Sequence, residues 1–222
     1  LGILAGNKLF FGAFLIFVLA RREWRASVFF VAGGVFTLLI SAVGAGLPSI
    51  LDYLRVLGGV TWYSATWNSS ILGFVTRLFG EPGNDPLIRI PLLASILGKS
   101  FSLLGLGLLI LMARRGHSKG STQGLNDLAF SACIVLMLIV SPLGWMYYFP
   151  FLLIPLTVIW RESLRLPERG WIRAGLISAW LLSTTPKLLV QSDHLEGDPV
   201  LILGWAGTYF YSLIIFVVLL WR

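Results

Sequence analysis

Residues 26–47 read ASVFFVAGGVFTLLISAVGAGL, a run without any charged side chain. This run is longer than the roughly 18 apolar residues that indicate a helix crossing a membrane. Residues 200–220, VLILGWAGTYFYSLIIFVVLL, form a second run of this kind near the other end of the chain. Because the hydrocarbon core of a bilayer offers no water to backbone groups, such segments must be helical. The two runs therefore predict an all-α membrane protein and argue against a soluble all-α core.

The composition agrees with this interpretation. Charged residues make up 12% of the chain and apolar residues 57%, whereas a soluble domain has about a quarter charged residues and just under half apolar ones. The net charge of +7 comes from short basic clusters between apolar runs, which is typical of membrane topology and argues against nucleic acid as a partner. Cys133 is the only cysteine, so neither a disulfide nor a cysteine metal site can form within the chain.

The alternation of apolar runs and short polar loops predicts a polytopic bundle of about seven spans, with residues 1–222 as one transmembrane domain. The predicted spans are residues 1–20, 26–47, 90–112, 125–140, 145–160, 172–190 and 200–220. The fourth and fifth spans meet at residues 141–144, where Pro and Gly indicate a tight turn. Gly105 and Gly107 in the third span are expected to allow close helix contact.

Lys and Arg residues set the predicted orientation. They concentrate on one side of the predicted membrane, at residues 21–25, 114–119, 161–173 and 222. Acidic residues concentrate on the other side, in residues 48–89 and 191–199. The basic side is therefore predicted to be cytoplasmic. Because the chain starts with Leu1 inside an apolar run, without the pattern of a signal peptide, we expect it to be the C-terminal part of a longer protein whose N-terminal helices pack against this bundle.

Residues 48–89 form the predicted external loop, and apolar spacing within the loop indicates two short helices. One stripe consists of Ile50, Leu51, Leu54 and Leu57, and the other of Ile71, Phe74, Val75 and Leu78. Both helices are predicted to lie in the membrane interface, with Arg77 on the polar side of the second.

Asn68, Ser69 and Ser70 precede the second of these helices and form a cluster of capping residues. The free N–H groups at a helix start favour an anionic ligand such as a lipid phosphate. Asn68 and Ser70 are therefore candidate ligand-binding residues. The alternative is that Asn68 caps the helix and binds no ligand.

Basic residues are further candidates for binding a lipid phosphate. Lys8 and Lys99 lie inside apolar runs, where a lysine costs roughly 2.5–3.5 kcal/mol at the bilayer centre. Each either extends its side chain to the interface or meets an anionic partner. Arg77, Arg89 and Lys187 fall at the external interface, and with Lys8 they are predicted to form a basic pocket. The alternative is that each of these residues faces lipid headgroups on its own.

Residues 141–149, SPLGWMYYF, bring Trp145, Tyr147 and Tyr148 to the second external turn. This pattern is either a helix break with an aromatic belt or a platform on which a sugar ring or a prenyl chain stacks. The acidic loop 191–199 leaves a divalent cation open as a cofactor, the alternative being a solvated loop. No other metal site is predicted.

Four segments, in this order, resemble a known family. They are Lys8 in the first helix followed by Arg21-Arg22-x-x-Arg25, Asp-Tyr-Leu-Arg-Val-Leu at residues 52–57, Trp-Asn-Ser-Ser at residues 67–70 with Arg77 beyond them, and Ser-Pro-x-x-Trp-x-x-Tyr at residues 141–148. Over most of its length the chain resembles the C-terminal portion of glycosyltransferase family 87. That family comprises polyprenol-phosphate-mannose-dependent mannosyltransferases and their relatives, with the GT-C membrane architecture.

The resemblance implies a GT-C-like enzyme of the bacterial plasma membrane with its active side facing out. It would move mannose, or another hexose or pentose, from a polyprenyl-phosphate donor to a glycolipid or glycan acceptor. Such a reaction needs a base for the acceptor hydroxyl and cations for the departing phosphate. The family's base is an Asp in the first external loop, which is expected upstream of residue 1.

The family's positions carry over to several residues of this chain, namely Lys8, Asn68, Ser70, Arg77, Ser141, Pro142, Trp145 and Tyr148. Two residues depart from the family pattern. Leu9 stands where the family often has Pro, and Tyr147 stands where it often has His. These departures leave the donor, the acceptor and the activity of this member open.

Two other classes of function also stay open. A polytopic transporter or lipid flippase would use intramembrane charges such as Lys8 and Lys99 together with broken helices. The sequence shows no convincing internal repeat, which such proteins usually have. The third class is a non-catalytic membrane scaffold.

Overall fold

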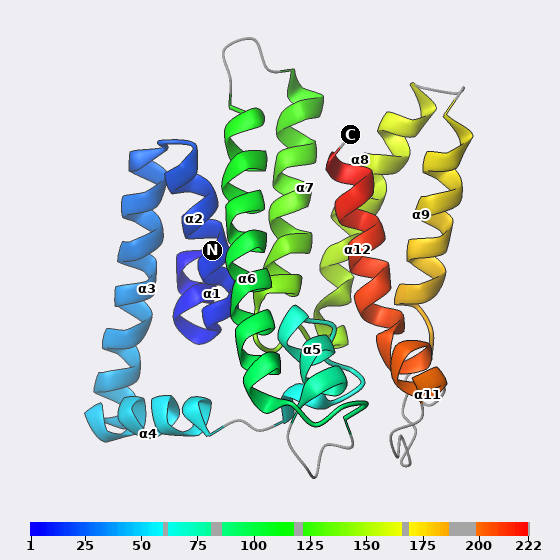
Figure 1. Cartoon of the computed structure of the whole chain (residues 1–222). Helices are drawn as coiled ribbons and strands as arrows, with labels where there is room; N and C mark the ends of the chain where they lie inside the picture. Colours follow the sequence, from blue (N-terminus) through cyan, green and yellow to red (C-terminus); the bar gives the residue numbers. More distant parts are fainter. Residues whose placement is uncertain (60–61, 81–85, 118–121, 166–168, 187–198, 222) are drawn as a thin grey trace. The chain divides into compact units, whose positions relative to one another are not determined.

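The computed structural model describes residues 1–59, 62–80, 86–117, 122–165, 169–186 and 199–221. These residues form helices joined by turns, and within them a single isolated β-bridge joins Asn68 to Trp145. The chain divides into two compact units, Leu1–Trp62 and Tyr63–Arg222, and each is described by itself (Figure 1). The predicted all-α class is confirmed.

Unit 1 consists of α1 (Gly2–Asn7), the 3₁₀ helix η1 (Leu9–Gly12), α2 (Ala13–Ala20), α3 (Trp24–Ala45) and α4 (Leu47–Gly58). The prediction of one continuous helix over residues 1–20 is wrong, because the backbone is extended at Lys8 (φ −144°, ψ 104°). Gly6 and Asn7, two weak helix formers, precede this break. The Lys8 side chain is exposed.

The contact between α1 and α3 depends on small residues. A Cβ atom on Gly2 would overlap the Phe30 carbonyl oxygen, and one on Gly33 would lie 3.1 Å from the Ile3 backbone nitrogen. The Thr37 hydroxyl also donates a hydrogen bond to the Ile3 carbonyl at 3.3 Å. Close backbone approach of this kind is typical of helices that pack in lipid.

The helix α4 matches the first short helix predicted for residues 48–89. It begins after Gly46, whose φ of 82° is a conformation that favours glycine. Side chains 51–56 are all exposed, and Arg55 pairs with Asp52 at 2.9 Å. The apolar side chains among residues 51–56 therefore lack cover within unit 1, as expected of a helix that lies in an interface.

Unit 2 is built around α7 (Gln123–Val140). Residues 131–139 of α7 are all buried, because α6 (Pro91–Arg115), α8 (Leu153–Leu164) and α12 (Thr208–Trp221) pack around this helix. On the outside, α5 (Ile71–Phe79) packs against α6, and α9 (Gly170–Ser183) packs against α12 (Figure 1). The remaining elements are η3 (Met146–Leu152), α11 (Pro199–Leu203) and η4 (Trp205–Gly207).

Four of the described helical segments are long and apolar enough to cross a membrane: α3, α6, α7 and Pro199–Trp221. The other three predicted spans contain shorter helices. In the fifth, η3 precedes α8 because Pro150 lacks the N–H that an α-helix needs, and α8 itself has 12 residues. In the sixth, α9 has 14 residues and ends at Ser183. The chain is thus a polytopic, all-α membrane protein.

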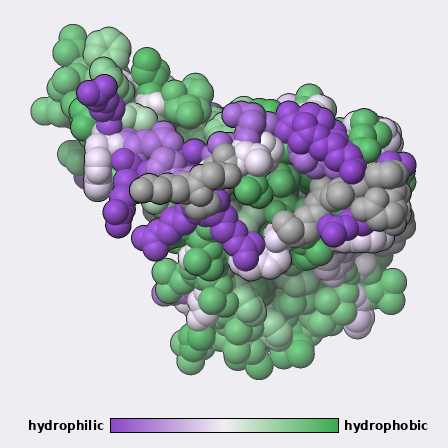
Figure 2. Space-filling view, turned by 90° about the horizontal axis from the view of Figure 1, so that it is seen from above, coloured by the Kyte–Doolittle hydropathy of each residue, from purple (hydrophilic) through white to green (hydrophobic). Residues whose placement is uncertain are grey.

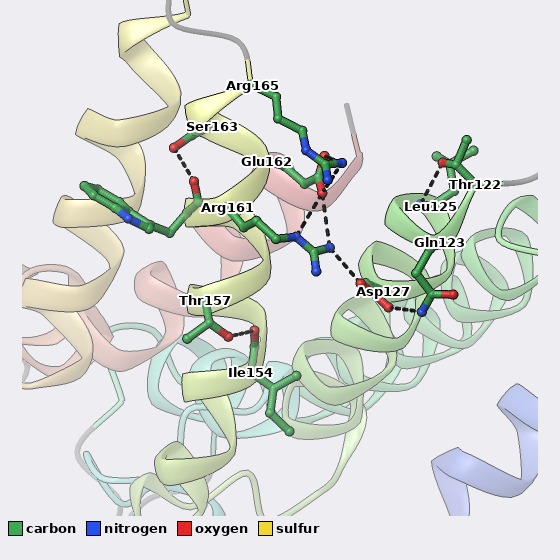
Figure 3. A network of polar contacts seen from close by, with 11 residues as sticks. Thr122, Gln123, Leu125, Asp127, Ile154, Thr157, Arg161, Glu162, Ser163 and Arg165 are labelled. Atoms are coloured by element: carbon green, nitrogen blue, oxygen red, sulfur yellow. Dashed lines mark hydrogen bonds and ion pairs between the residues drawn. The ribbon is translucent and has the colours of Figure 1, made fainter.

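One end of unit 2, where α6 ends and α7 begins, carries Arg114 and Arg115 and is called the basic end here. Viewed onto this end, Figure 2 shows hydrophilic residues gathered across the middle of the view and hydrophobic residues along its edges. Arg161 of α8 lies 2.6 Å from Asp127 of α7 and 3.1 Å from Glu162, so a charged network joins the last turn of α8 to the first turns of α7 (Figure 3). Exposed ion pairs contribute little free energy singly, but this network fixes which turns meet.

Gly105 and Gly107 of α6 provide a matched test of this packing. A Cβ atom on Gly105 would lie 2.6 Å from Cγ2 of Val140, whereas one on Gly107 would meet no atom within 4 Å. The predicted close contact is therefore confirmed for Gly105 and wrong for Gly107. Because overpacking costs about 1–3 kcal/mol, Gly105→Leu is expected to lower the thermal unfolding midpoint in detergent and Gly107→Leu to leave it unchanged. Equal midpoints would contradict the α6–α7 contact.

Candidate functional site

The two motifs that stand apart in the sequence, residues 67–70 and residues 141–148, meet at the end of unit 2 opposite to the basic end. The Ser69 N–H donates to the Gly144 carbonyl at 2.8 Å, and the Met146 N–H donates to the Trp67 carbonyl at 3.1 Å. These bonds pair the two segments in antiparallel fashion. Residues 67–70 and 141–146 are called the loop pair from here on.

The Asn68 side chain lies at the centre of the loop pair and is fully buried. Its Nδ2 donates to the carbonyl oxygens of Tyr63 and Pro142, each at 3.0 Å. Its Oδ1 accepts from the N–H groups of Ser70 and Gly144, each at 3.1 Å. Both donors and both acceptor positions of the amide are thereby used. Asn68 therefore has no hydrogen-bonding capacity left for a ligand in this arrangement.

Ser69 and Ser70, the serines beside Asn68, add further hydrogen bonds between the two loops. Ser70 is the N-cap of α5, because its Oγ accepts from the Gly73 N–H at 3.0 Å, as predicted from the capping cluster. The same hydroxyl donates to the Pro142 carbonyl at 3.2 Å, and the Ser69 hydroxyl donates to the Gly144 carbonyl. Both serines are fully buried. Their hydroxyls thus join loops rather than face an open surface.

Two glycines are required by this arrangement: Gly144, which belongs to the turn predicted at residues 141–144, and Gly73, for which the sequence analysis made no prediction. A Cβ atom on Gly73 would lie 2.8 Å from Cγ of Asn68, and one on Gly144 would overlap the Leu138 carbonyl oxygen. A glycine within an apolar helical pattern, as at Gly73, is the signal from which a close approach can be predicted.

The helix α5 matches the second short helix that the sequence predicts, but it is covered by other parts of unit 2. All of residues 71–80 are buried or half-buried, because α5 packs against α6 and Phe74 stacks on Phe210 of α12 with ring centroids 4.4 Å apart. Arg77 was predicted to lie on a polar face at the interface, and this placement is wrong. The side chain is only 2% exposed and turns into the protein.

The Arg77 guanidinium is a buried cation beside the loop pair. Its Nη1 donates to the carbonyl oxygens of Ala65 at 2.9 Å and Asn68 at 3.0 Å. Within the part of the chain that the structure describes, Nε and Nη2 have no hydrogen-bond partner. Burial lowers the pKa of Arg77 to about 10, with Tyr211 acting weakly in the opposite direction. Arg77 therefore still carries its charge at neutral pH.

Aromatic side chains surround the loop pair. The Trp145 ring meets the edge of Trp67 at a centroid distance of 5.2 Å and stacks parallel to Tyr148 at 6.3 Å. Trp145 and Tyr148 are half-buried, whereas Tyr147 is 61% exposed. An exposed aromatic ring, Tyr147, therefore follows the loop pair directly, while Trp67, Trp145 and Tyr148 are half-buried and contact one another.

The remaining predicted site residues lie elsewhere. Arg89 is exposed just before α6, so it does not share a surface with the buried Arg77. Lys8 belongs to unit 1, and Lys187 lies outside the described residues. The acidic loop 191–199 also falls almost entirely outside them. Among the residues that are described, no cluster of three or more His, Cys, Asp or Glu side chains is placed to hold a metal ion.

Comparison with known proteins gives one match. The family model of Glycosyltransferase family 87 matches residues 1–142. The matched region contains α1 to α7, all of residues 67–70 and the first two residues of the second motif. No curated protein and no solved structure matches the chain.

Asn68→Ala tests whether Asn68 holds the loop pair together. The change removes the partner of the Ser70 and Gly144 N–H groups and of the Tyr63 carbonyl, while the Pro142 carbonyl keeps its bond to the Ser70 hydroxyl. Each buried polar group that loses its partner costs about 1–3 kcal/mol. We expect the free energy of unfolding to fall by about 3 kcal/mol or more. Tyr147→Ala, which removes an exposed side chain next to the same loops, is expected to change the free energy of unfolding by less than about 0.5 kcal/mol. Denaturation curves that coincide for the two variants would contradict the role of Asn68.

Proposed function

Because this chain belongs to glycosyltransferase family 87, we propose that it moves a sugar from a polyprenyl-phosphate donor to a glycolipid or glycan acceptor. Family membership makes the chain a membrane glycosyltransferase. The GT-C architecture, mannose or another hexose or pentose as the sugar, and the lipid-linked donor are the finer parts of the proposal. They rest on the motifs of the sequence and on the chemistry of the loop pair.

The proposed location of the site is inferred from the loop pair. Asn68 and Pro142 are 74 positions apart in the chain, yet a buried hydrogen bond joins them. Side chains on and beside these loops are therefore held in place before any substrate binds. Preorganised charges and dipoles of this kind are what stabilise a transition state without further reorganisation.

Arg77 is proposed to stabilise the negative charge of the departing phosphate. Its charge has no ion-pair partner among the described residues, and Nε and Nη2 form the edge with which arginine binds phosphate through two hydrogen bonds. Since the side chain is buried, a donor phosphate reaches that edge only if the side chains that cover it move, while the hydrogen bonds of the loop pair stay in place. Before that movement, the charge acts through the protein interior, where Coulomb interactions are stronger than in water.

Tyr147 is proposed to contact the sugar or the prenyl chain of the donor. It is the exposed ring next to the loop pair, and Trp145 and Tyr148 support the backbone on either side of it. An aromatic face stacks on the apolar face of a sugar or on isoprene units without requiring a particular hydrogen bond. Such a contact suits a donor that carries both groups.

The membrane face with the loop pair is proposed to be the outer face of the plasma membrane. The arginines of the basic end lie at the opposite end of α6 and α8, as the distribution of positive charge in membrane proteins requires. Lys8, Arg89 and Lys187 remain proposed contacts of a lipid phosphate. A divalent cation is left open as a further partner of that phosphate.

A lipid flippase is the second candidate function, and the break at Lys8 is the observation that favours it. An interrupted helix with a charged residue at the break is a common feature of transporters. Reconstitution into proteoliposomes separates the two candidates. Movement of a polyprenyl-phosphate lipid without any covalent product supports the flippase, whereas a glycosylated product supports the transferase.

The transferase proposal is tested with full-length protein, a radiolabelled polyprenol-phosphate sugar and a membrane acceptor. Arg77→Met removes the charge and is expected to lower the transfer rate about a hundredfold. Tyr147→Ala is expected to raise the KM for the donor about tenfold, as loss of one aromatic stacking contact does, with little change in kcat. Arg114→Gln, at the basic end, removes an equal charge and is expected to leave both constants unchanged.

Arg77→Lys separates loss of charge from loss of folding. Lysine keeps the charge without the two-bond geometry, so we expect a transfer rate between those of the unsubstituted protein and Arg77→Met. The thermal midpoint of each variant shows whether it is folded. A folded Arg77→Met variant with an unchanged rate would contradict the assignment of Arg77 to the phosphate.

A further inference from the structure

A cavity of about 410 Å³ opens at the basic end of unit 2, between the ends of three packed helices. Its wall includes Met112 and Arg115 of α6, Leu125, Leu128 and Ala129 of α7, and Leu220 of α12. The volume lies within the range of ligand pockets, about 300–1,000 Å³. Because α7 runs from this end to the loop pair, the cavity is separate from the proposed transferase site.

The cavity combines an apolar wall with one cation. Leu128, Ala129 and Leu220 are buried or half-buried, while Leu125 is 43% exposed at the opening. Arg115 is the charged residue of the wall, and its guanidinium carbon lies 4.1 Å from the centroid of the Trp221 ring. Its Nη1 also lies 3.4 Å from the Trp221 carbonyl oxygen. The guanidinium is thus held in one orientation on the rim.

The position of the cavity determines which molecules reach it. α6, α7 and Pro199–Trp221 are long and apolar enough to cross a membrane, so their ends lie where hydrocarbon meets headgroups. Trp221 is a residue type that prefers this level. A lipid of the surrounding bilayer therefore has direct access to the cavity, and its phosphate has the same depth as Arg115.

We propose that this cavity binds an anionic phospholipid, with an acyl chain against the leucines and the phosphate on Arg115. The charge of the rim favours an anionic over a zwitterionic headgroup, because the charged side chain among the residues that line the cavity is the cation Arg115. The nearest acid of the α7 first turns, Asp127, is already paired with Arg161. Basic pockets between transmembrane helices are known to select anionic headgroups in this way.

The test uses native mass spectrometry of the full-length protein, titrated with phosphatidylglycerol or with phosphatidylcholine of the same chains. We expect phosphatidylglycerol to bind about tenfold more tightly, and Arg115→Gln to remove that preference, since a hydrogen bond to a charged group is worth a factor of about ten or more. Arg114→Gln, one residue away and outside the cavity wall, is the matched control and is expected to change the affinity less than about twofold.

Leu125→Trp gives an independent variant, because it fills the opening without removing a charge or a buried side chain. It is expected to weaken binding of both lipids at least about fivefold, with an unchanged thermal midpoint. Equal losses for Arg115→Gln and Arg114→Gln would overturn the proposal, as would equal affinities for the two lipids. Unchanged binding in a folded Leu125→Trp variant would overturn it as well.

Discussion

Four hydrogen bonds from one buried amide, that of Asn68, determine how unit 2 is organised at the proposed site. A turn between membrane helices cannot leave backbone groups without partners, since little water is present to replace them. Asn68 meets this requirement for two turns at once, because it bonds Tyr63 and Ser70 in its own segment and Pro142 and Gly144 in the other. Two loops that are distant in sequence thereby become one structural element.

The residues around Asn68 have the size and the hydrogen-bonding groups that this arrangement requires. Gly73 and Gly144 leave room where any Cβ atom would strike Asn68 or the Leu138 carbonyl. Arg77 donates to the carbonyl groups of Ala65 and Asn68, and the Ala65 carbonyl also accepts from the Asn68 backbone N–H. The proposed chemistry depends on a fixed backbone at the loop pair. A buried cation and an exposed aromatic ring can act together on one substrate only if the backbone between them is held in place.

The sequence predicts the long helices well and the local breaks poorly. An uncharged run that exceeds the thickness of a bilayer is sufficient to predict α3 or the segment Pro199–Trp221, whatever surrounds them. The break at Lys8 and the 3₁₀ segment at η3 depend on backbone details that hydropathy does not contain. Similarly, the motifs identify residues 67–70 and 141–148 as important but not as partners. A polar position beside an apolar stripe predicts that Arg77 turns away from the protein, toward lipid headgroups or a phosphate. In the structure α5 packs against α6 and Phe210 of α12, and Arg77 turns to backbone carbonyls instead.

Hydrogen exchange of the full-length protein in lipid nanodiscs tests the pairing of the two loops most directly. Backbone N–H groups of Ser69, Ser70, Gly144 and Met146 are bonded across the loop pair or to Asn68. They should therefore exchange as slowly as those of α7, although they lie in turns at a membrane surface. Exchange of these four amides at the rate of an open loop would show that the two segments are not joined, and the proposed site would lose its framework.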